Sequence, residues 1–248
     1  MPRFFVDPSD VRDGLIVLKN ENARHISLSL RLAVGDEVTV CDGSRLYDCV
    51  LVRFDGVTVD AEIRETRPVD TEPPYVAHLY QALPKGDKLD TVIQKAVECG
   101  VSEIVPFESS RCIVRMKPEA ESKKTERRAR IAEEAAKQCG RGVIPSVRAT
   151  VSFARAMDMA AEADIVLFCY EGDATRPLGD ILRAHPTLCK GRRPHVAIVI
   201  GSEGGFSPDE ARAAADRGFA MTGLGKRILR TETASSFVLA ALCLQYEL

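Results

Sequence analysis

The chain has 248 residues, with 34 Lys and Arg against 36 Asp and Glu, and its formal net charge is −2. This length is typical of one or two domains and suffices to bury a hydrophobic core. Its 45% hydrophobic and 28% charged residues exclude a disordered or collagen-like chain. No apolar run reaches the roughly 18 residues of a membrane span, and the start of the chain lacks the pattern of a secretory signal.

The eight cysteines are scattered along the chain and form no CxxC pair. Their spacing argues against a zinc ribbon and against a small disulfide-stabilised fold. We therefore expect free thiols, no metal site and a reducing cytoplasmic environment. The cysteines lie at positions 41, 49, 99, 112, 139, 169, 189 and 243.

Positive charge is concentrated in one segment of the chain. From Arg111 to Arg148 there are eleven basic and five acidic residues, so this segment carries +6 and the rest of the chain −8. Such asymmetry is typical of a surface that binds a polyanion. A solvated helix explains it equally well, because acidic and basic residues there recur at i,i+4 spacing, as in Glu126 and Arg130.

The first seventy residues predict a small β-rich domain, most simply a barrel. Residues 38–40 alternate between apolar and polar after a turn, which favours a strand. The pairs Asp42-Gly43 and Asp55-Gly56 are hairpin signals between runs rich in β-forming residues. Three prolines and alternating acids at 67–74 predict a linker, so we expect one domain over 1–70 and a second over 75–248.

From residue 75 onward the pattern is that of an α/β domain. An apolar strand at 76–83, a helix capped by Asp87 that stops at Gly100, and a strand at 104–107 form a βαβ unit. Such a unit implies a parallel sheet. Further predicted elements are a helix over 118–139, strands over 165–169, 196–200 and 221–222, a helix with a capping box from Ser207 to Glu210, and an apolar helix that ends the chain.

Two glycine-rich turns follow strands in the last third of the chain. Gly201, Gly204 and Gly205 come directly after the strand at 196–200, and Gly223-Leu224-Gly225 follows the next strand. In open α/β sheets ligands bind at the carboxyl ends of strands, where glycines let the backbone approach closely. Tight turns alone would also explain the glycines. The cationic and hydroxyl-rich stretch that follows favours a nucleoside-sized ligand, whereas the glycine spacing disfavours a dinucleotide or triphosphate loop.

The sequence of these turns resembles the RsmE family, ribosomal RNA small subunit methyltransferases that make N3-methyluridine in 16S rRNA. The motifs are Gly-Ser-Glu-Gly-Gly-Phe-Ser at 201–207 and the stretch at 224–234. Further matches lie at 1–6, 25–36, 85–101, 111–112 and 134–145, so the resemblance covers essentially the whole chain. Two residues depart from the family pattern: Ser202 replaces a usual proline, and Arg128 stands where a tryptophan is usual.

The resemblance implies a PUA-like RNA-binding β-barrel followed by a SPOUT α/β domain whose C-terminal segment forms a trefoil knot. It implies S-adenosylmethionine as cofactor, 16S rRNA of the small ribosomal subunit as substrate and a homodimer as the working unit. The apolar last helix fits a dimer contact, although burial within one subunit explains it as well. The implied cofactor-binding residues are Ile200, Gly201, Glu203, Gly204, Gly205, Leu224, Gly225, Ile228, Leu229, Arg230 and Thr231.

Methylation of uridine N3 requires that its proton be lost and that the developing anion be stabilised. We expect Arg230 to supply the positive charge and Glu232 or Glu203 to accept the proton, although a cap or turn hydrogen bond explains either glutamate as well. Thr231 and Thr233 more simply satisfy loop backbone or the cofactor. For contacts to RNA phosphates we expect Arg3, Arg31, Arg111, Arg115, Arg127 and Arg141.

Three other functions are compatible with parts of the sequence. A related SPOUT enzyme could methylate a ribose 2′-hydroxyl, and a PUA-like domain could serve an RNA-binding factor without catalysis. The intact glycine turns argue against the second of these. A generic nucleotide-binding α/β enzyme leaves the segment of charge +6 unexplained.

Overall fold

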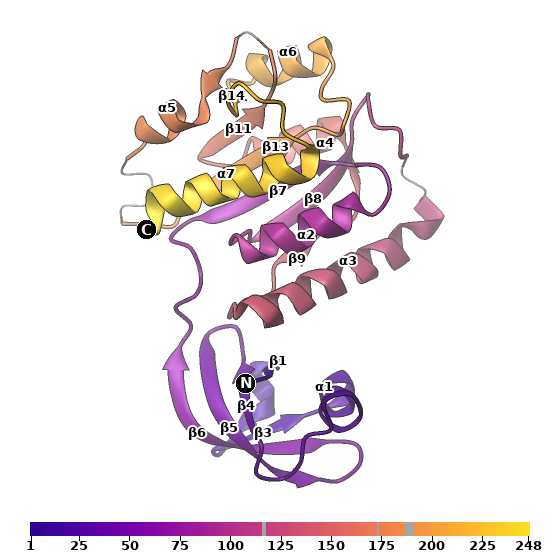
Figure 1. Cartoon of the computed structure of the whole chain (residues 1–248), viewed down its shortest axis with the longest axis vertical. Helices are drawn as coiled ribbons and strands as arrows, with labels where there is room; N and C mark the ends of the chain where they lie inside the picture. Colours follow the sequence, from indigo (N-terminus) through magenta and orange to yellow (C-terminus); the bar gives the residue numbers. More distant parts are fainter. Residues whose placement is uncertain (116–117, 173, 187–190) are drawn as a thin grey trace. The chain divides into compact units, whose positions relative to one another are not determined.

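The computed structural model describes residues 1–115, 118–172, 174–186 and 191–248 (Figure 1). The chain forms two compact units. The first unit consists of Met1–Glu72 with Ala136–Ile144, and the second of Pro73–Ala135 with Pro145–Leu248. Lys117, which contributes to the segment charge, and Cys189 lie outside the described residues.

The first unit is built on one six-stranded sheet. Its strands are β1 (Arg3–Phe5), β2 (Val11–Arg12), β3 (Leu15–Leu18), β4 (Glu37–Cys41), β5 (Arg45–Phe54) and β6 (Val59–Pro68). They lie in the order β1-β4-β5-β6-β3-β2, and all neighbours are antiparallel except β1 and β4. The two predicted hairpins are confirmed, with Gly43 and Gly56 at positive φ in the turns that flank β5.

A helical segment between β3 and β4 was not predicted, since the sequence indicated only strands and turns there. It comprises α1 (Asn20–Arg24) and a π-helical turn over His25–Leu30. Ile26 of this turn is fully buried in the same core as Phe4 and the inward-facing strand residues. The helical segment therefore helps to form the core of the first unit.

The predicted linker at 67–74 belongs largely to the first unit. β6 extends to Pro68, Thr71 Oγ1 accepts a hydrogen bond from Gly142 N at 2.9 Å, and Glu72 forms an ion pair with Arg141. These contacts bring residues 136–144 into the first unit, whereas the sequence division placed them in the second domain.

The second unit carries an eight-stranded parallel sheet. Its strands are β7 (Val76–Ala82), β8 (Glu103–Glu108), β9 (Ser146–Val147), β10 (Val151–Ser152), β11 (Ile165–Cys169), β12 (Arg176–Pro177), β13 (His195–Ile200) and β14 (Ala220–Gly223). Their order is β10-β8-β7-β13-β11-β14-β12, with β9 also paired to β8. All pairs are parallel, as the predicted βαβ unit implies. The N-terminal antiparallel and C-terminal parallel α/β organisation is thus confirmed.

Within the described residues, six helices accompany the sheet of the second unit. They are α2 (Lys88–Glu98), α3 (Pro118–Cys139), α4 (Phe153–Ala160), α5 (Leu178–Arg183), α6 (Pro208–Asp216) and α7 (Thr231–Tyr246). The predicted capping box of α6 is confirmed: Ser207 Oγ accepts from Glu210 N at 3.2 Å, and Ser207 N donates to Glu210 Oε2 at 2.9 Å. α2 and α7 lie side by side over one face of the sheet (Figure 1).

The last helix, α7, packs on α2 and on the central strands β7 and β13. The C-terminal segment thus lies against the middle of the sheet. The trefoil knot stays a prediction. No helix among the described residues has the length and hydropathy needed to cross a membrane. The seven cysteines in the same part of the chain are free thiols, and no three His, Cys, Asp or Glu side chains there are grouped to hold a metal ion.

Candidate functional site

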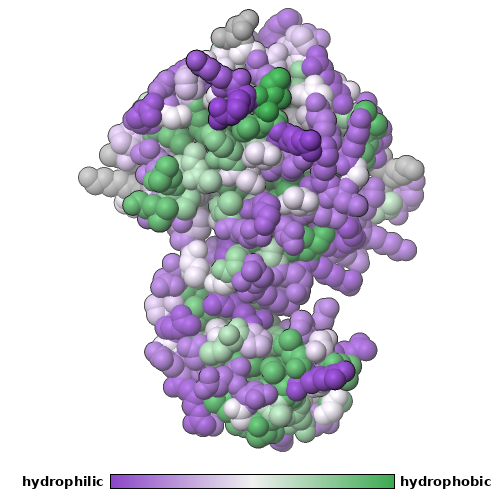
Figure 2. Space-filling model, in the orientation of Figure 1, coloured by the Kyte–Doolittle hydropathy of each residue, from purple (hydrophilic) through white to green (hydrophobic). Residues whose placement is uncertain are grey.

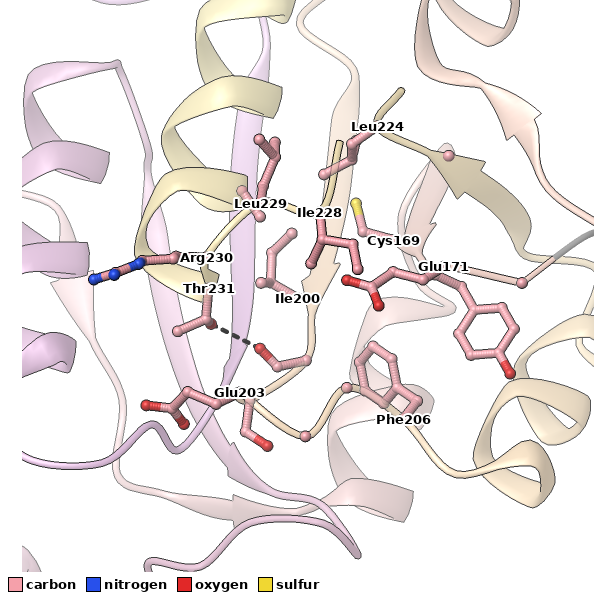
Figure 3. A pocket seen from close by; sticks show the side chains of 18 of the residues that line it. Cys169, Glu171, Ile200, Glu203, Phe206, Leu224, Ile228, Leu229, Arg230 and Thr231 are labelled. Atoms are coloured by element: carbon pink, nitrogen blue, oxygen red, sulfur yellow. Dashed lines mark hydrogen bonds between the residues drawn. The ribbon is translucent and has the colours of Figure 1, made fainter. Parts of the chain in front are cut away.

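A cavity of about 920 Å³ opens at the carboxyl ends of β11, β13 and β14 (Figure 3). Ligands bind at this edge of parallel sheets because the loops that follow the strands converge there. Three stretches form most of the lining: 169–172 with Thr175, 200–206 and 223–231. The two glycine turns predicted from the sequence therefore face one cavity.

The loop after β13, residues 201–206, is packed so closely that at two of its glycines a side chain would force neighbouring atoms to move. A Cβ atom on Gly201 would lie 3.1 Å from the Cα of Gly205, and one on Gly204 would lie 3.1 Å from the Cβ of Arg111. Gly205 itself takes a φ of +63°, which glycine adopts without strain. At these three glycines the loop presents backbone to a ligand, whereas Ser202, Glu203 and Phe206 line the cavity beside them.

Apolar side chains gather at the centre of the cavity. Figure 3 shows Ile200, Leu229 and Ile228 close together, with Leu224 and the sulfur of Cys169 beside them. Desolvation raises the pKa of the Cys169 thiol to about 12, so it stays protonated and adds an apolar surface rather than a nucleophile. This arrangement suits a flat apolar group such as a purine.

Glu203 lines the cavity but its carboxylate is already engaged. Its Oε1 accepts hydrogen bonds from Lys88 Nζ at 2.7 Å and from Lys85 N at 3.1 Å. Burial alone would raise the pKa of this carboxyl, but the hydrogen bonds from Lys88 and from backbone N–H groups lower it overall. A carboxylate held in this way is a poor proton acceptor and instead fixes the loop to the start of α2.

The two predicted catalytic residues lie differently with respect to the cavity. Arg230 lines it, is exposed, and occupies the N-cap position of α7. In Figure 3 its side chain extends away from the apolar centre. Glu232 is not among the lining residues, and its Oε2 atom is buried without a hydrogen-bond partner in the described part of the chain.

Thr231 joins the two glycine turns. Its hydroxyl donates a hydrogen bond to the carbonyl oxygen of Gly201 at 2.7 Å, drawn as the dashed line in Figure 3. The Oγ1 atom of Thr231 also accepts a hydrogen bond from Gln81 Nε2 at 2.8 Å. Thr231 thus satisfies loop backbone, which is one of the two roles expected for it.

Three of the arginines predicted to bind RNA lie in the second unit and already have protein partners. Arg111 lines the cavity and donates to the carbonyl oxygen of Gly204 at 3.0 Å. Arg115 forms an ion pair with Glu108 at 2.8 Å, and Arg127 donates to Asp90 Oδ1 at 3.0 Å. All three are exposed, so their remaining donors can still reach a phosphate.

The other three predicted RNA-binding arginines lie in the first unit. Arg31 is exposed and takes a φ of +54°. Arg3 is half-buried and donates to the backbone oxygens of Gly140 and Arg141. Arg141 is only 4% exposed and pairs with Glu72. This burial contradicts the prediction that Arg141 contacts RNA, because its guanidinium is used inside the unit.

The segment of charge +6 does not serve RNA binding alone. Residues 136–144 of it belong to the first unit and the rest to the second, and Arg128 within it is buried. Four of its arginines pair with acids from outside the segment: Arg115 with Glu108, Arg127 with Asp90, Arg141 with Glu72 and Arg148 with Glu103. Much of the excess charge is therefore neutralised within the fold.

Sequence reasoning missed one wall of the cavity. This wall consists of Cys169, the last residue of β11, and of Tyr170, Glu171, Gly172 and Thr175, which follow the strand. They carry no glycine-rich motif, but the carboxyl end of a predicted central strand was a usable signal. Lys88, Arg111, Ser202 and Phe206 also line the cavity without having been predicted as cofactor-binding residues.

Comparison with known sequences gives a consistent result. A family model described as an RNA methyltransferase domain matches residues 71–243. The chain is 32% identical to ribosomal RNA small subunit methyltransferase E of Bacillus subtilis over 234 residues, which are 93% of this chain and 90% of that protein. It is also 32% identical to the protein of the same name from Aquifex aeolicus over 225 residues, 90% of this chain and 91% of that one.

Comparison with solved structures extends the likeness to three dimensions. The crystal structure of a ribosomal RNA small subunit methyltransferase E from Neisseria gonorrhoeae, bound to S-adenosyl methionine, matches with a TM-score of 0.83 and 31% identity. The match covers 99% of this chain and 98% of that one. The likeness therefore includes both units and not only the sheet that carries the cavity.

Proposed function

The chain belongs to the ribosomal RNA small subunit methyltransferase E family, and from this membership we propose that it methylates N3 of a uridine in 16S rRNA, with S-adenosylmethionine as the methyl donor. The observation that carries the proposal is the cavity formed by the two glycine turns at the carboxyl edge of the parallel sheet. It lies in a chain that matches a cofactor-bound relative over nearly its whole length.

The lining fits a cofactor that combines a purine with a charged amino-acid tail. Ile200, Leu224 and Ile228 offer apolar surface to the purine, and residues 201–205 and 224–230 line the cavity, where their backbone can approach the cofactor. Arg111 and Lys226 offer positive charge to a carboxylate. When bound, the cofactor supplies a methyl group on a sulfonium, which a nucleophile in line with the carbon–sulfur bond can displace.

Within this proposal Arg230 stabilises the negative charge that develops on the uracil ring as N3 loses its proton. Its permanent positive charge and its place on the cavity wall support this role. The N3–methyl bond forms as the carbon–sulfur bond breaks, and the proton passes to a carboxylate or to water. Glu232 remains the predicted acceptor although it is not among the lining residues, since Glu203 is held by Lys88.

A homodimer is part of the proposal. α7 leaves Phe237 45% exposed and Leu244 72% exposed, although Val238, Leu239 and Leu242 on the same helix are buried. Figure 2 shows hydrophobic surface over the region where Figure 1 places α7. Exposed apolar side chains beside a buried stripe are typical of a helix that packs on a second subunit. A ribosomal substrate would place the enzyme in the cytoplasm.

The direct test uses purified protein, isotopically labelled S-adenosylmethionine and small ribosomal subunits from cells that lack this modification. After nuclease digestion, label is expected in N3-methyluridine and in no other nucleoside. Label in a 2′-O-methylnucleoside would identify a different SPOUT activity. RNA binding without any cofactor binding would identify a non-catalytic factor, and methylation that does not depend on RNA would point to another α/β enzyme.

A further inference from the structure

A buried glutamine lies behind the cavity and contacts both of the turns that form it. Gln81 is at the carboxyl end of β7 and is 0% exposed. Its register partner on the neighbouring strand β13 is Ile200, the residue that precedes the first glycine of the loop. Gln81 is absent from the cavity lining, so it does not itself meet a bound ligand.

The hydrogen bonds of Gln81 form a directed chain. Its Nε2 atom donates to Thr231 Oγ1 at 2.8 Å and to the carbonyl oxygen of Ala82 at 3.0 Å, and it makes a longer contact of 3.4 Å to the carbonyl oxygen of Gly201. Thr231 Oγ1 then donates to the carbonyl oxygen of Gly201 at 2.7 Å. Since the Thr231 proton is directed at Gly201, the threonine oxygen can only accept from Gln81, which fixes the orientation of the amide.

This chain ties together three elements that are far apart in the sequence. Gly201 is the first residue of the loop after β13, and Thr231 is the first residue of α7, directly after Arg230. Both turns line the cavity, and the Thr231–Gly201 hydrogen bond connects them, so we expect the position of Thr231 to set the spacing between them. Without Gln81 the threonine hydroxyl keeps its bond to Gly201 but loses the group that holds it in place.

We propose that Gln81 is a positioning residue for cofactor binding, which acts through Thr231 to hold the two glycine turns and the backbone of Arg230 in register. This inference rests on the proposed function. It assigns a task to a residue that neither touches the ligand nor lies in either glycine motif.

A second feature of Gln81 separates this role from a purely structural one. Its Oε1 atom is buried without a hydrogen-bond partner in the described part of the chain. A buried unsatisfied acceptor destabilises the fold, so glutamine is a costly choice for this position if packing alone is required. Replacing Gln81 by leucine removes this unsatisfied oxygen along with the amide donor. Stability is therefore expected to change little or to rise, while cofactor binding weakens.

The test measures cofactor affinity by isothermal titration calorimetry, together with kcat, KM and the midpoint of thermal unfolding. For Gln81→Leu we expect S-adenosylmethionine affinity to fall about five- to tenfold, the size of one buried hydrogen bond. The unfolding midpoint should stay at or above that of the wild type. Thr231→Val should lose at least as much affinity, whereas Thr231→Ser, which keeps the hydroxyl, should restore most of it.

Two further variants sharpen the test. The double variant Gln81→Leu/Thr231→Val should bind nearly as well as Thr231→Val alone, because Gln81 acts mainly through Thr231 and otherwise reaches Gly201 only by a contact of 3.4 Å. Ser235→Ala is the matched control: it removes a fully buried hydroxyl of α7 that donates to Glu232 O within the same helix. Its cofactor affinity should equal that of the wild type.

The outcomes separate this inference from the function on which it rests. Wild-type protein that binds no S-adenosylmethionine would overturn both. Wild-type binding with unchanged affinity in Gln81→Leu would overturn the positioning role alone. A loss of affinity that follows a lowered unfolding midpoint would also overturn it, because glutamine would then serve the fold and not the spacing of the turns.

Discussion

Glu203 illustrates how the partners of one side chain decide its role. Its place beside the cavity suits a proton acceptor, but Lys88 Nζ and Lys85 N both donate to it. The glycines that flank it need to be held in a close-packed loop, and an ion pair to α2 provides one fixed point. We therefore expect Glu203 to position the loop and leave proton transfer to another group.

Replacing Glu203 by Gln tests this role. We expect cofactor affinity to fall about threefold, as for a partly exposed ion pair, with kcat nearly unchanged. Because the folded-state pKa of Glu203 lies below its ordinary value of 4.5, the charged form stabilises the wild type at neutral pH. This advantage over the variant should disappear as the pH falls below 4.5 and through the folded-state pKa, which thermal unfolding in a pH series can measure. A loss of kcat by orders of magnitude at unchanged KM would instead make Glu203 the base.

At the scale of elements, α3 is anchored by a buried ionic network. Arg128, 7% exposed, donates to Glu121 Oε1 at 3.0 Å and to Thr150 Oγ1 at 3.1 Å. Glu121 also accepts from Thr150 N at 2.8 Å. Burial alone would raise the pKa of the Glu121 carboxyl, but the bonds from Thr150 and Arg128 lower it overall. An arginine is thus accommodated at a buried position, because an acid on the same helix neutralises it.

Truncating Arg128 to Ala should strongly destabilise the second unit. The substitution leaves the Glu121 carboxylate buried without its cation, which is expected to lower the free energy of unfolding by about 3 kcal/mol. Urea denaturation gives the value directly. Arg130→Ala, at an exposed position on the same helix, should change it by less than about 0.5 kcal/mol. Equal effects of the two substitutions would show that the network contributes no more than a surface residue does.

The elements that sequence could predict are those whose signals are local. The glycine turns and the capping box at Ser207 depend on residues a few positions apart, and both were predicted. The two-residue strands β9, β10 and β12 are too short to show periodicity, and the cavity wall after β11 lacks a motif. Gln81 could not be predicted as a functional residue from the sequence. Its proposed role depends on β13 lying beside β7, and no local sequence pattern specifies that pairing.

At the scale of the whole molecule, the count of basic residues predicts RNA binding less well than their exposure does. An arginine that is buried in an ion pair with an acidic side chain is not available to RNA. Arg31 and Arg141 were both predicted to contact RNA, but one is exposed and the other is buried against Glu72. One arginine is thus available for contacts at the surface, whereas the other stabilises the interior of the first unit. Only exposed cations can release counterions from RNA on binding.

The pair Arg31→Ala and Arg141→Ala separates these roles. Arg31→Ala should weaken RNA binding and reduce the slope of log affinity against log salt by about one, with unchanged stability. Arg141→Ala should leave that slope unchanged and lower the unfolding midpoint instead. Filter binding at several salt concentrations and thermal unfolding provide the two measurements. A smaller salt slope for Arg141→Ala would reinstate it as an RNA contact.

The proposed dimer gives a prediction at the same scale. Phe237→Asp places a charge on the exposed side of α7 and should convert a dimer to a monomer in sedimentation velocity experiments. Leu28→Asp, at a 69% exposed position in the first unit, is the matched control and should remain dimeric. A wild-type protein that sediments as a monomer would contradict the proposal.

The return of residues 136–144 to the first unit has a consequence for how the protein is made. The first unit lacks part of its packing, including the Arg141 partner of Glu72 and the Gly140 carbonyl bound by Arg3, until that stretch has left the ribosome. More than half of the polypeptide must therefore be synthesised before the N-terminal unit can reach its final state. A fragment ending at Glu72 would carry every strand of its sheet and still be incomplete, so ordinary truncation is a poor way to isolate this unit.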